Sequence, residues 1–280
     1  MKKLFIYNFY ILIAILSSCD IIDPPYIESG ENIPVNSNQN VLLELFTGHQ
    51  CSNCPAAETT IEQLKGLYGE KLNIIAYHTG FYASTSEKFP VDYRTIEGSE
   101  FESFFQVQFY PSGMINRVWN KQSYLLNPIE WAPFIADQLN HKDSVLLELS
   151  TDTDTTTRIC NASVKVSIST NISEELKLCV FLAEDSLVST QSVSGNPLYP
   201  DGIIPDYVHM HVFRESFNGM WGDIIFKQDT ANQRSGSFTY SKILNPSYNI
   251  NNCSIIAFIY LNQDKSILQS NSIKLALEIP

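Results

Sequence analysis

Two cysteines, separated by two residues, follow an apolar stretch early in the chain. Residues 49–55 read HQCSNCP, so Cys51 and Cys54 form a C-x-x-C pair. A thiolate can attack the sulfur of a substrate disulfide, and a second cysteine three positions on can then resolve the mixed disulfide. We therefore interpret Cys51 as the attacking residue and Cys54 as the resolving residue of a thiol–disulfide exchange site.

The elements on either side of this pair should place it at the start of a helix. Residues 41–46 (VLLELF) have the length and composition of a buried strand. Pro55 is typical of the first turn of a helix, and the residues after it place Ile61 and Leu64 on one apolar face. Cys51 then lies just ahead of the helix, where N–H groups and the helix dipole favour a thiolate. This order of strand, C-x-x-C loop and helix resembles the thioredoxin fold.

Two further segments of the front half agree with that resemblance. Residues 72–77 (LNIIAY) form a second candidate strand. Residues 109–116 (FYPSGMIN) resemble the segment in which thioredoxin-like proteins carry a cis-proline that faces the dithiol. The resemblance implies that Pro111 is cis and lies against Cys51, and that the backbone of Tyr110 contacts an extended substrate.

The rest of the front half divides into a helix and an irregular segment. Residues 129–140 (IEWAPFIADQLN) follow an Asn-Pro start signal and carry an apolar stripe, so they predict a helix. Residues 78–100 lack a clear period. We interpret them as an insertion beside the active face, either a lid or a substrate-contacting loop.

Two positions depart from the thioredoxin pattern. Gln50 stands where a tryptophan usually precedes the first cysteine, and Leu45 stands six residues before Cys51, where thioredoxin has a buried aspartate. Glu44 is adjacent, but strand alternation turns its side chain to the opposite face. The acid that would deprotonate Cys54 is therefore missing from this pattern or comes from elsewhere.

Other chemistry is open to the same residues. His49 and the two cysteines supply one nitrogen and two sulfurs, one ligand short of a closed zinc site, so we predict no metal and no cofactor. A purely structural disulfide in an oxidising compartment is the main alternative to redox exchange. In that alternative the protein is a non-enzymatic binding or scaffold lipoprotein.

After residue 143 the pattern changes to short β-type runs with turn residues between them. Seven candidate strands in residues 144–280, with alternation as in residues 164–168 (VKVSI), predict an immunoglobulin-like β-sandwich. Cys160, Cys179 and Cys253 lie in these strands, either as buried free thiols or as one disulfide and one thiol. The candidate strands are VLLELST, RICNASVKVSIST, LKLCVFLAED, YVHMHVFRES, GSFTYSKIL, CSIIAFIYLN and SIKLALEI.

Two histidines of the back half have ligand-like spacing. His209 and His211 alternate along the candidate strand YVHMHVFRES, so both imidazoles should point to one face. A metal would still need a third ligand, for which His78 is the distant candidate. A plain polar face of the sheet is the simpler interpretation.

The start of the chain is typical of a bacterial lipoprotein signal. Residues 1–18 form the signal peptide, in which the apolar run of residues 4–16 is too short to cross a hydrocarbon core of about 30 Å. The run ends in LSSC, which resembles the lipobox, so Cys19 should become the acylated N-terminus and bind membrane lipid. Residues 19–39, rich in Pro, Asn and Ser, should form a flexible tether.

Composition limits the partners further. The formal net charge of −12 repels phosphate backbones and excludes nucleic acid as a partner. A hydrophobic content of 44% is enough for buried cores and excludes a chain that is disordered throughout. The expected partners are other envelope proteins, which would react through their thiols or disulfides.

The whole mature chain resembles one known family. The matching stretches are LLELFTGHQCSNCPAAE (42–58), FYPSGMINR (109–117) and DYVHMHVFRESFNGMWGD (206–223). They are similar to outer-membrane-protein-28-type lipoproteins of the Bacteroidetes group, which join a thioredoxin-like domain to an immunoglobulin-like one. The resemblance implies a thioredoxin-like domain at 40–143, a sandwich at 144–280, and an outer membrane lipoprotein that faces the periplasm or the cell surface.

Overall fold

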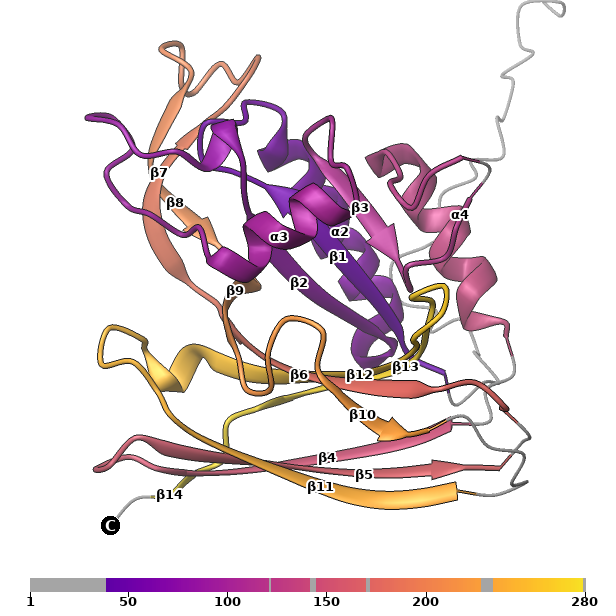
Figure 1. The fold of residues 1–280 in the computed structure, drawn as a ribbon. Coiled ribbons are helices and arrows are strands. Elements are labelled where there is room, and N and C mark those ends of the chain that lie inside the picture. The colour runs from indigo at the N-terminus through magenta and orange to yellow at the C-terminus, as the bar shows by residue number, and fades with distance from the viewer. Residues whose placement is uncertain (1–38, 121, 142–144, 170–171, 228–233, 279–280) are drawn as a thin grey trace, which may run out of the picture. The chain divides into compact units, whose positions relative to one another are not determined.

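A computed structural model describes residues 39–120, 122–141, 145–169, 172–227 and 234–278 (Figure 1). All of them fall in one unit of the fold, residues 32–280. The predicted signal peptide (1–18), Cys19, the tether apart from its last residue and the predicted domain boundary after residue 143 lie outside the described residues. Within the described ranges, no helix has both the length and the apolar character needed to span a bilayer.

The front half is built on three strands. β1 (Val41–Thr47) pairs in parallel with β2 (Leu72–His78) and antiparallel with β3 (Ser112–Ile115). Alternate residues of β1 face opposite sides, and Leu43 and Leu45 pack against α2 (Cys54–Tyr68) and α4 (Pro128–Leu139). The C-x-x-C loop therefore leaves a strand that is buried on both faces.

The local sequence explains where these helices begin and end. α2 has Pro55 in its first turn and ends at Tyr68. Its C-cap is Gly69, whose φ of 53° is positive and which begins the short helix η2 (Gly69–Lys71). α4 begins at a capping box in which Asn127 N donates to Glu130 Oε2 at 2.9 Å.

A third helix starts inside the segment that the sequence predicts to be irregular. After the turn η3 (Phe81–Ala83), Thr95 caps α3 (Ile96–Phe104), and its Oγ1 accepts from Gly98 N at 3.0 Å. Within α3, only Gly98 and Phe101 are buried. Because so few of its residues face the core, the sequence of this helix shows no regular spacing of apolar residues.

The back half contains two sheets that pack face to face (Figure 1). Their shared core is apolar and includes the strand residues predicted to alternate, such as Val164 and Val166. One sheet has the order β11 (Arg234–Ile243), β5 (Ile159–Ile168), β4 (Val145–Asp154) and β14 (Leu277–Glu278). Facing it are β6 (Leu176–Glu184), β12 (Cys253–Leu261), β13 (Ile267–Lys274) and β10 (Asp223–Phe226), with η4 (Ile250–Asn252) leading into β12.

One strand joins the two halves into a continuous sheet. β9 (Val212–Ser216) pairs antiparallel with β6 and in parallel with β2, where Ala76 N donates to His211 O at 2.7 Å. The sheet order is β13-β12-β6-β9-β2-β1-β3, with β10 beside β6. Strands from both sides of residue 144 thus share one sheet.

The candidate strand YVHMHVFRES is not one strand, and that prediction is wrong. β8 (Ile203–His209) pairs with β7 (Leu187–Ser192), the chain turns at His211 with φ of 58°, and β9 begins at Val212 in another sheet. Neither β7 nor β10 is among the predicted strands. A left-handed turn at a histidine has no signal in the apolar pattern, which continues through it.

The cysteines of the back half are all reduced. Cys160, Cys179 and Cys253 are free and buried, which confirms the prediction of buried thiols over that of a disulfide. Burial raises the pKa of Cys179 and of Cys253 to about 12, so both stay protonated at neutral pH. These thiols act as small apolar side chains in the core.

A buried ion pair lies where the front and back halves meet. Arg117 Nε donates to Glu44 Oε2 at 2.6 Å, and Arg117 Nη2 and Tyr77 OH donate to Glu44 Oε1 at 2.7 and 2.9 Å. The guanidinium carbon lies 4.9 Å from the ring centre of Phe258 and 5.6 Å from that of Tyr260, both on β12. Glu44 thus faces away from α2, as strand alternation predicts.

Candidate functional site

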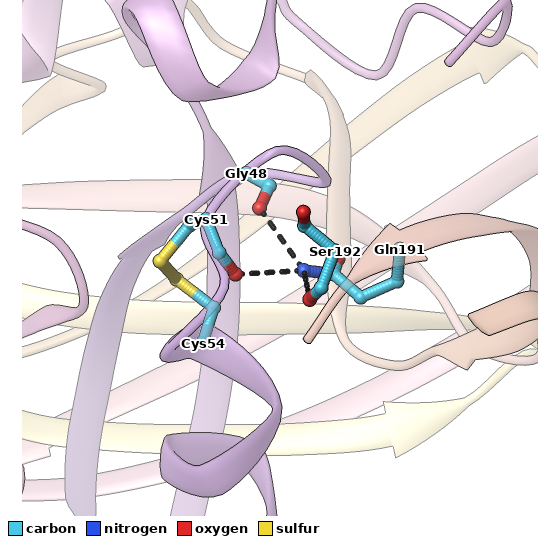
Figure 2. The surroundings of a disulfide bond; sticks show 5 residues. All are labelled: Gly48, Cys51, Cys54, Gln191 and Ser192. Carbon is cyan, nitrogen blue, oxygen red and sulfur yellow. Dashed lines mark hydrogen bonds between the residues drawn. A yellow bond between two sulfur atoms is a disulfide. The ribbon is translucent and has the colours of Figure 1, made fainter. Parts of the chain in front are cut away.

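The Cys51–Cys54 disulfide closes the loop between β1 and α2 (Figure 2). The two Cα atoms are 5.4 Å apart, and Cys54 is the first residue of α2. On reduction, a thiolate at Cys51 would lie at the amino end of this helix, where the dipole stabilises negative charge. The bond uses both sulfurs, and across the described ranges no three His, Cys, Asp or Glu side chains are grouped to hold a metal ion.

One side of this loop is held by the end of β7. Gln191 Nε2 donates to the carbonyl oxygens of Cys51 at 2.9 Å and of Gly48 at 3.5 Å (Figure 2). Ser192 N donates to His49 O at 2.7 Å. A segment from beyond residue 144 therefore fixes the backbone of the loop that carries Cys51.

The turn η3 holds the other side of the loop. Gln50 N donates to Tyr82 O at 2.8 Å, and Gln50 Nε2 donates to Ser84 Oγ at 3.0 Å. A Cβ atom at Gly48 would lie 2.5 Å from the carbonyl carbon of Tyr82, so this close approach requires glycine. Gln50, which replaces the usual tryptophan, thus serves to hold the loop against η3.

The two cysteines are buried, although the two residues between them are exposed to solvent. Cys51 is 3% exposed and Cys54 is 2% exposed, whereas Ser52 and Asn53 are exposed to solvent. An attacking thiolate must reach a sulfur atom along the S–S axis. A partner thiol therefore needs part of the surrounding loop to move before exchange can begin.

Tyr110 and Pro111 lie between α3 and β3. The Tyr110–Pro111 peptide bond is cis. Tyr110 OH donates to Glu102 Oε1 at 2.5 Å and shares a 2.9 Å hydrogen bond with Thr79 Oγ1, and burial raises the pKa of the phenol. The Tyr110 ring meets that of Tyr82 edge to face at 5.5 Å, which links this segment to η3. Among the described residues, none hydrogen-bonds to the backbone N–H or C=O of Tyr110.

One carboxyl group of α2, that of Glu58, has a raised pKa. Glu58 lies four residues beyond Cys54, and burial together with the neighbouring Glu62 raises the pKa of Glu58 to about 8. Such a carboxyl group keeps its proton at neutral pH, and its position one helical turn beyond Cys54 makes it the candidate acid on this helix. The spacing of four residues along a helix is the sequence signal that could have identified it.

His78 and His209 are in contact, whereas His209 and His211 do not form the pair that the sequence predicts. His209 meets His78 with ring centres 5.3 Å apart, and its Nε2 shares a 2.9 Å hydrogen bond with Ser189 Oγ. Burial lowers the pKa of His49, His78 and His209, so all three are neutral at pH 7. His211 points elsewhere, and its Nδ1 lies 3.2 Å from Asp185 Oδ1. The predicted pairing of His209 with His211 is wrong because the chain turns between them.

A family model described as outer membrane protein Omp28 matches residues 98–277, a span that begins after the C-x-x-C loop and includes Pro111. No curated protein matches the chain.

Several solved structures match this chain. HBP35 of Porphyromonas gingivalis is 18% identical, with a TM-score of 0.65 over 85% of this chain and 76% of its own. A domain of the outer membrane lipoprotein Omp28 from the same organism is 18% identical, with a TM-score of 0.34 over 49% of this chain and 92% of its own. A protein of Agrobacterium tumefaciens is 14% identical, with a TM-score of 0.47 over 86% and 97% of the two chains.

Proposed function

Because the chain belongs to the Omp28 family of outer membrane proteins, we propose that it is an envelope protein that performs thiol–disulfide exchange through Cys51 and Cys54. Family membership confirms the expected localisation, that of an outer membrane lipoprotein in the bacterial cell envelope. The observation that carries the redox proposal is a disulfide between the loop after β1 and the first residue of α2.

In this proposal, residues 40–143 provide a thioredoxin-like domain and residues 144–280 an immunoglobulin-like sandwich. Support for the first comes from the parallel pair of β1 and β2, the antiparallel neighbour β3 and the C-x-x-C pair at the start of a helix. Support for the second comes from two face-to-face sheets of short strands.

The exchange conserves atoms and electrons. A thiolate of a reduced partner attacks Cys51 Sγ, the Cys51–Cys54 bond breaks, and Cys54 leaves as a thiolate that can take a proton from Glu58. A second partner thiolate attacks the partner sulfur of the mixed disulfide and releases Cys51 as a thiolate. Two electrons pass from the partner to this protein, and the reverse sequence reduces a partner disulfide.

A trapping experiment tests this proposal. Cys54→Ser, expressed as the full lipoprotein in a host that exports and lipidates it, should accumulate mixed disulfides with envelope proteins, because the resolving thiol is gone. Cys51→Ser should not accumulate them, and Cys179→Ser, which alters a buried free thiol, should behave as wild type. Absence of mixed disulfides in Cys54→Ser, together with no reduction of insulin by the pure protein, would refute the redox proposal.

A structural disulfide is the second candidate, and the near-complete burial of both cysteines favours it. In that case the bond only rigidifies the loop, and the protein acts by binding or as a scaffold. A reduction potential below about −300 mV would support this candidate, because such a bond resists exchange.

Lipid attachment at Cys19 is part of the same proposal. The motif LSSC at the end of the apolar run supports it. Mass spectrometry of the mature protein should find acyl chains on an N-terminal Cys19, and Cys19→Ala should be unprocessed or soluble. An unmodified N-terminus, or cleavage at another position, would contradict the prediction.

A further inference from the structure

Away from the disulfide, a cavity opens between the carboxyl end of α3 and the segment that leads into α4. Its volume is about 380 Å³, within the range of roughly 300–1,000 Å³ that small-molecule sites occupy. It is lined by aromatic rings, three glutamines and a serine. The described lining residues include no charged group, in a chain whose net charge is −12.

The aromatic rings at this cavity are exposed and yet held in place. Trp119 is 58% exposed, and its ring meets that of Tyr124 edge to face with centres 4.7 Å apart. Phe104 is also exposed and packs against Phe105 at 5.0 Å and Trp221 at 4.7 Å. Rings fixed in this way offer apolar faces to a ligand with little further loss of conformational entropy.

The polar groups at the cavity are amides with spare hydrogen-bonding capacity. Gln106, Gln108 and Gln122 are exposed, and no described residue hydrogen-bonds to their side chains. Each amide offers both a carbonyl acceptor and N–H donors. Gln106 adopts a left-handed φ of 53°, a conformation that is uncommon for this residue type and that is often found at functional sites.

We propose that this cavity binds a neutral saccharide. Sugar hydroxyls both donate and accept hydrogen bonds, which matches amides, and the C–H face of a pyranose packs against the electron-rich face of an aromatic ring. An anionic ligand would find no cation among the described lining residues. A lipid chain would leave the exposed amides unused. The inference is independent of the dithiol chemistry.

Calorimetric titration of the full-length protein in detergent tests the proposal. The probes are maltotriose, cellotriose, chitotriose and mannotriose, with sialyllactose as the charged counterpart and decaproline as a peptide that favours aromatic grooves. We expect at least one neutral trisaccharide to bind with a Kd at or below about 1 mM and to protect Trp119 from acrylamide quenching.

Variants then locate the binding. Trp119→Ala should weaken it at least tenfold, while Trp119→Phe, which keeps an aromatic face, should stay within about threefold of wild type. Gln106→Gly should also weaken binding, and glycine suits the left-handed φ at this position. Phe81→Ala is the matched control, because Phe81 is 76% exposed but does not line the cavity.

Several results would overturn the proposal. These are no binding of any neutral trisaccharide, tighter binding of sialyllactose or decaproline, or binding that Trp119→Ala leaves unchanged. If Trp119→Ala fails to fold, Gln106→Gly and Gln122→Ala decide the question, since both change exposed side chains only.

Discussion

The imidazole of His209 should make the fold sensitive to acid. It is buried against His78 and hydrogen-bonded to Ser189, and burial, with a smaller contribution from His49, lowers the pKa of His209 to about 4. In the unfolded chain that pKa is about 6.5. The unfolded state therefore binds more protons between pH 6.5 and 4, and the stability present above pH 6.5 is lost as the pH falls towards 4.

The predicted loss from His209 is about 2–3 kcal/mol in the free energy of unfolding between pH 7 and pH 4.5. Urea unfolding at the two pH values measures it. His209→Gln should lose less stability over this range than wild type, whereas His141→Gln, at an exposed position, should follow wild type. Equal pH dependence in His209→Gln and wild type would show that His209 is not held neutral by the fold.

At the scale of elements, the C-x-x-C loop depends on segments that are distant in sequence. Gln191 at the end of β7 supports it, as does Ser194 just after that strand, whose N donates to Ser52 O at 2.9 Å. On the other side, η3 supports it through Tyr82. Because these hydrogen bonds are made to the backbone of the loop, reduction of the disulfide should weaken them. The strands β4 and β5 make no such contacts and should not respond.

Hydrogen-exchange mass spectrometry tests this prediction. Reduction should raise exchange in residues 47–57, 78–100 and 109–113 and also at 191–194, while the melting temperature moves by a few degrees, or about 1 kcal/mol. Gln191→Ala should raise exchange in the loop without reduction. Gln63→Ala, on the exposed face of α2, is the matched control. Unfolding of the front half on reduction would instead identify the bond as a structural staple.

The elements also show what the sequence can and cannot predict. β1, α2 and α4 are predictable, since burial gives each a regular apolar pattern and a proline or cap marks each helix start. The split between β8 and β9 is not, because one left-handed residue, His211, redirects an unbroken β-type run. Gln191 carries no local signal either, since its role depends on where β7 ends in space. At the site, the sequence reveals the cysteine pair. It does not reveal that both cysteines are buried.

At the scale of the whole molecule, the two halves should unfold together. The aromatic core between them takes Phe46 and Tyr77 from the front half and Phe181 and Phe258 from the back half. Arg117 lies fully buried in the same core, paired with Glu44 on β1 and packed on the rings of β12. Removing one partner of such a pair leaves an uncompensated charge.

Urea unfolding of the full chain should therefore show a single transition by both tryptophan fluorescence and circular dichroism. Arg117→Met should lower the free energy of unfolding by about 3–5 kcal/mol. Arg94→Met, which removes an exposed pair with Asp92, should cost at most about 1 kcal/mol. A fragment of residues 39–141 should not reach native structure alone. Two separate transitions, or a folded fragment, would show that the halves are independent.

The sheet that runs through both halves also imposes an order on biogenesis. β1 and β2 leave the ribosome first, but β9, the strand that covers the edge of β2, begins only at Val212. At a synthesis rate of about 5–20 residues per second, β9 emerges on the order of 10 s after β2. During that time the edge of β2 that β9 will cover is unpaired. Until β9 pairs with it, the edge of β2 is therefore a place where one chain can pair with another.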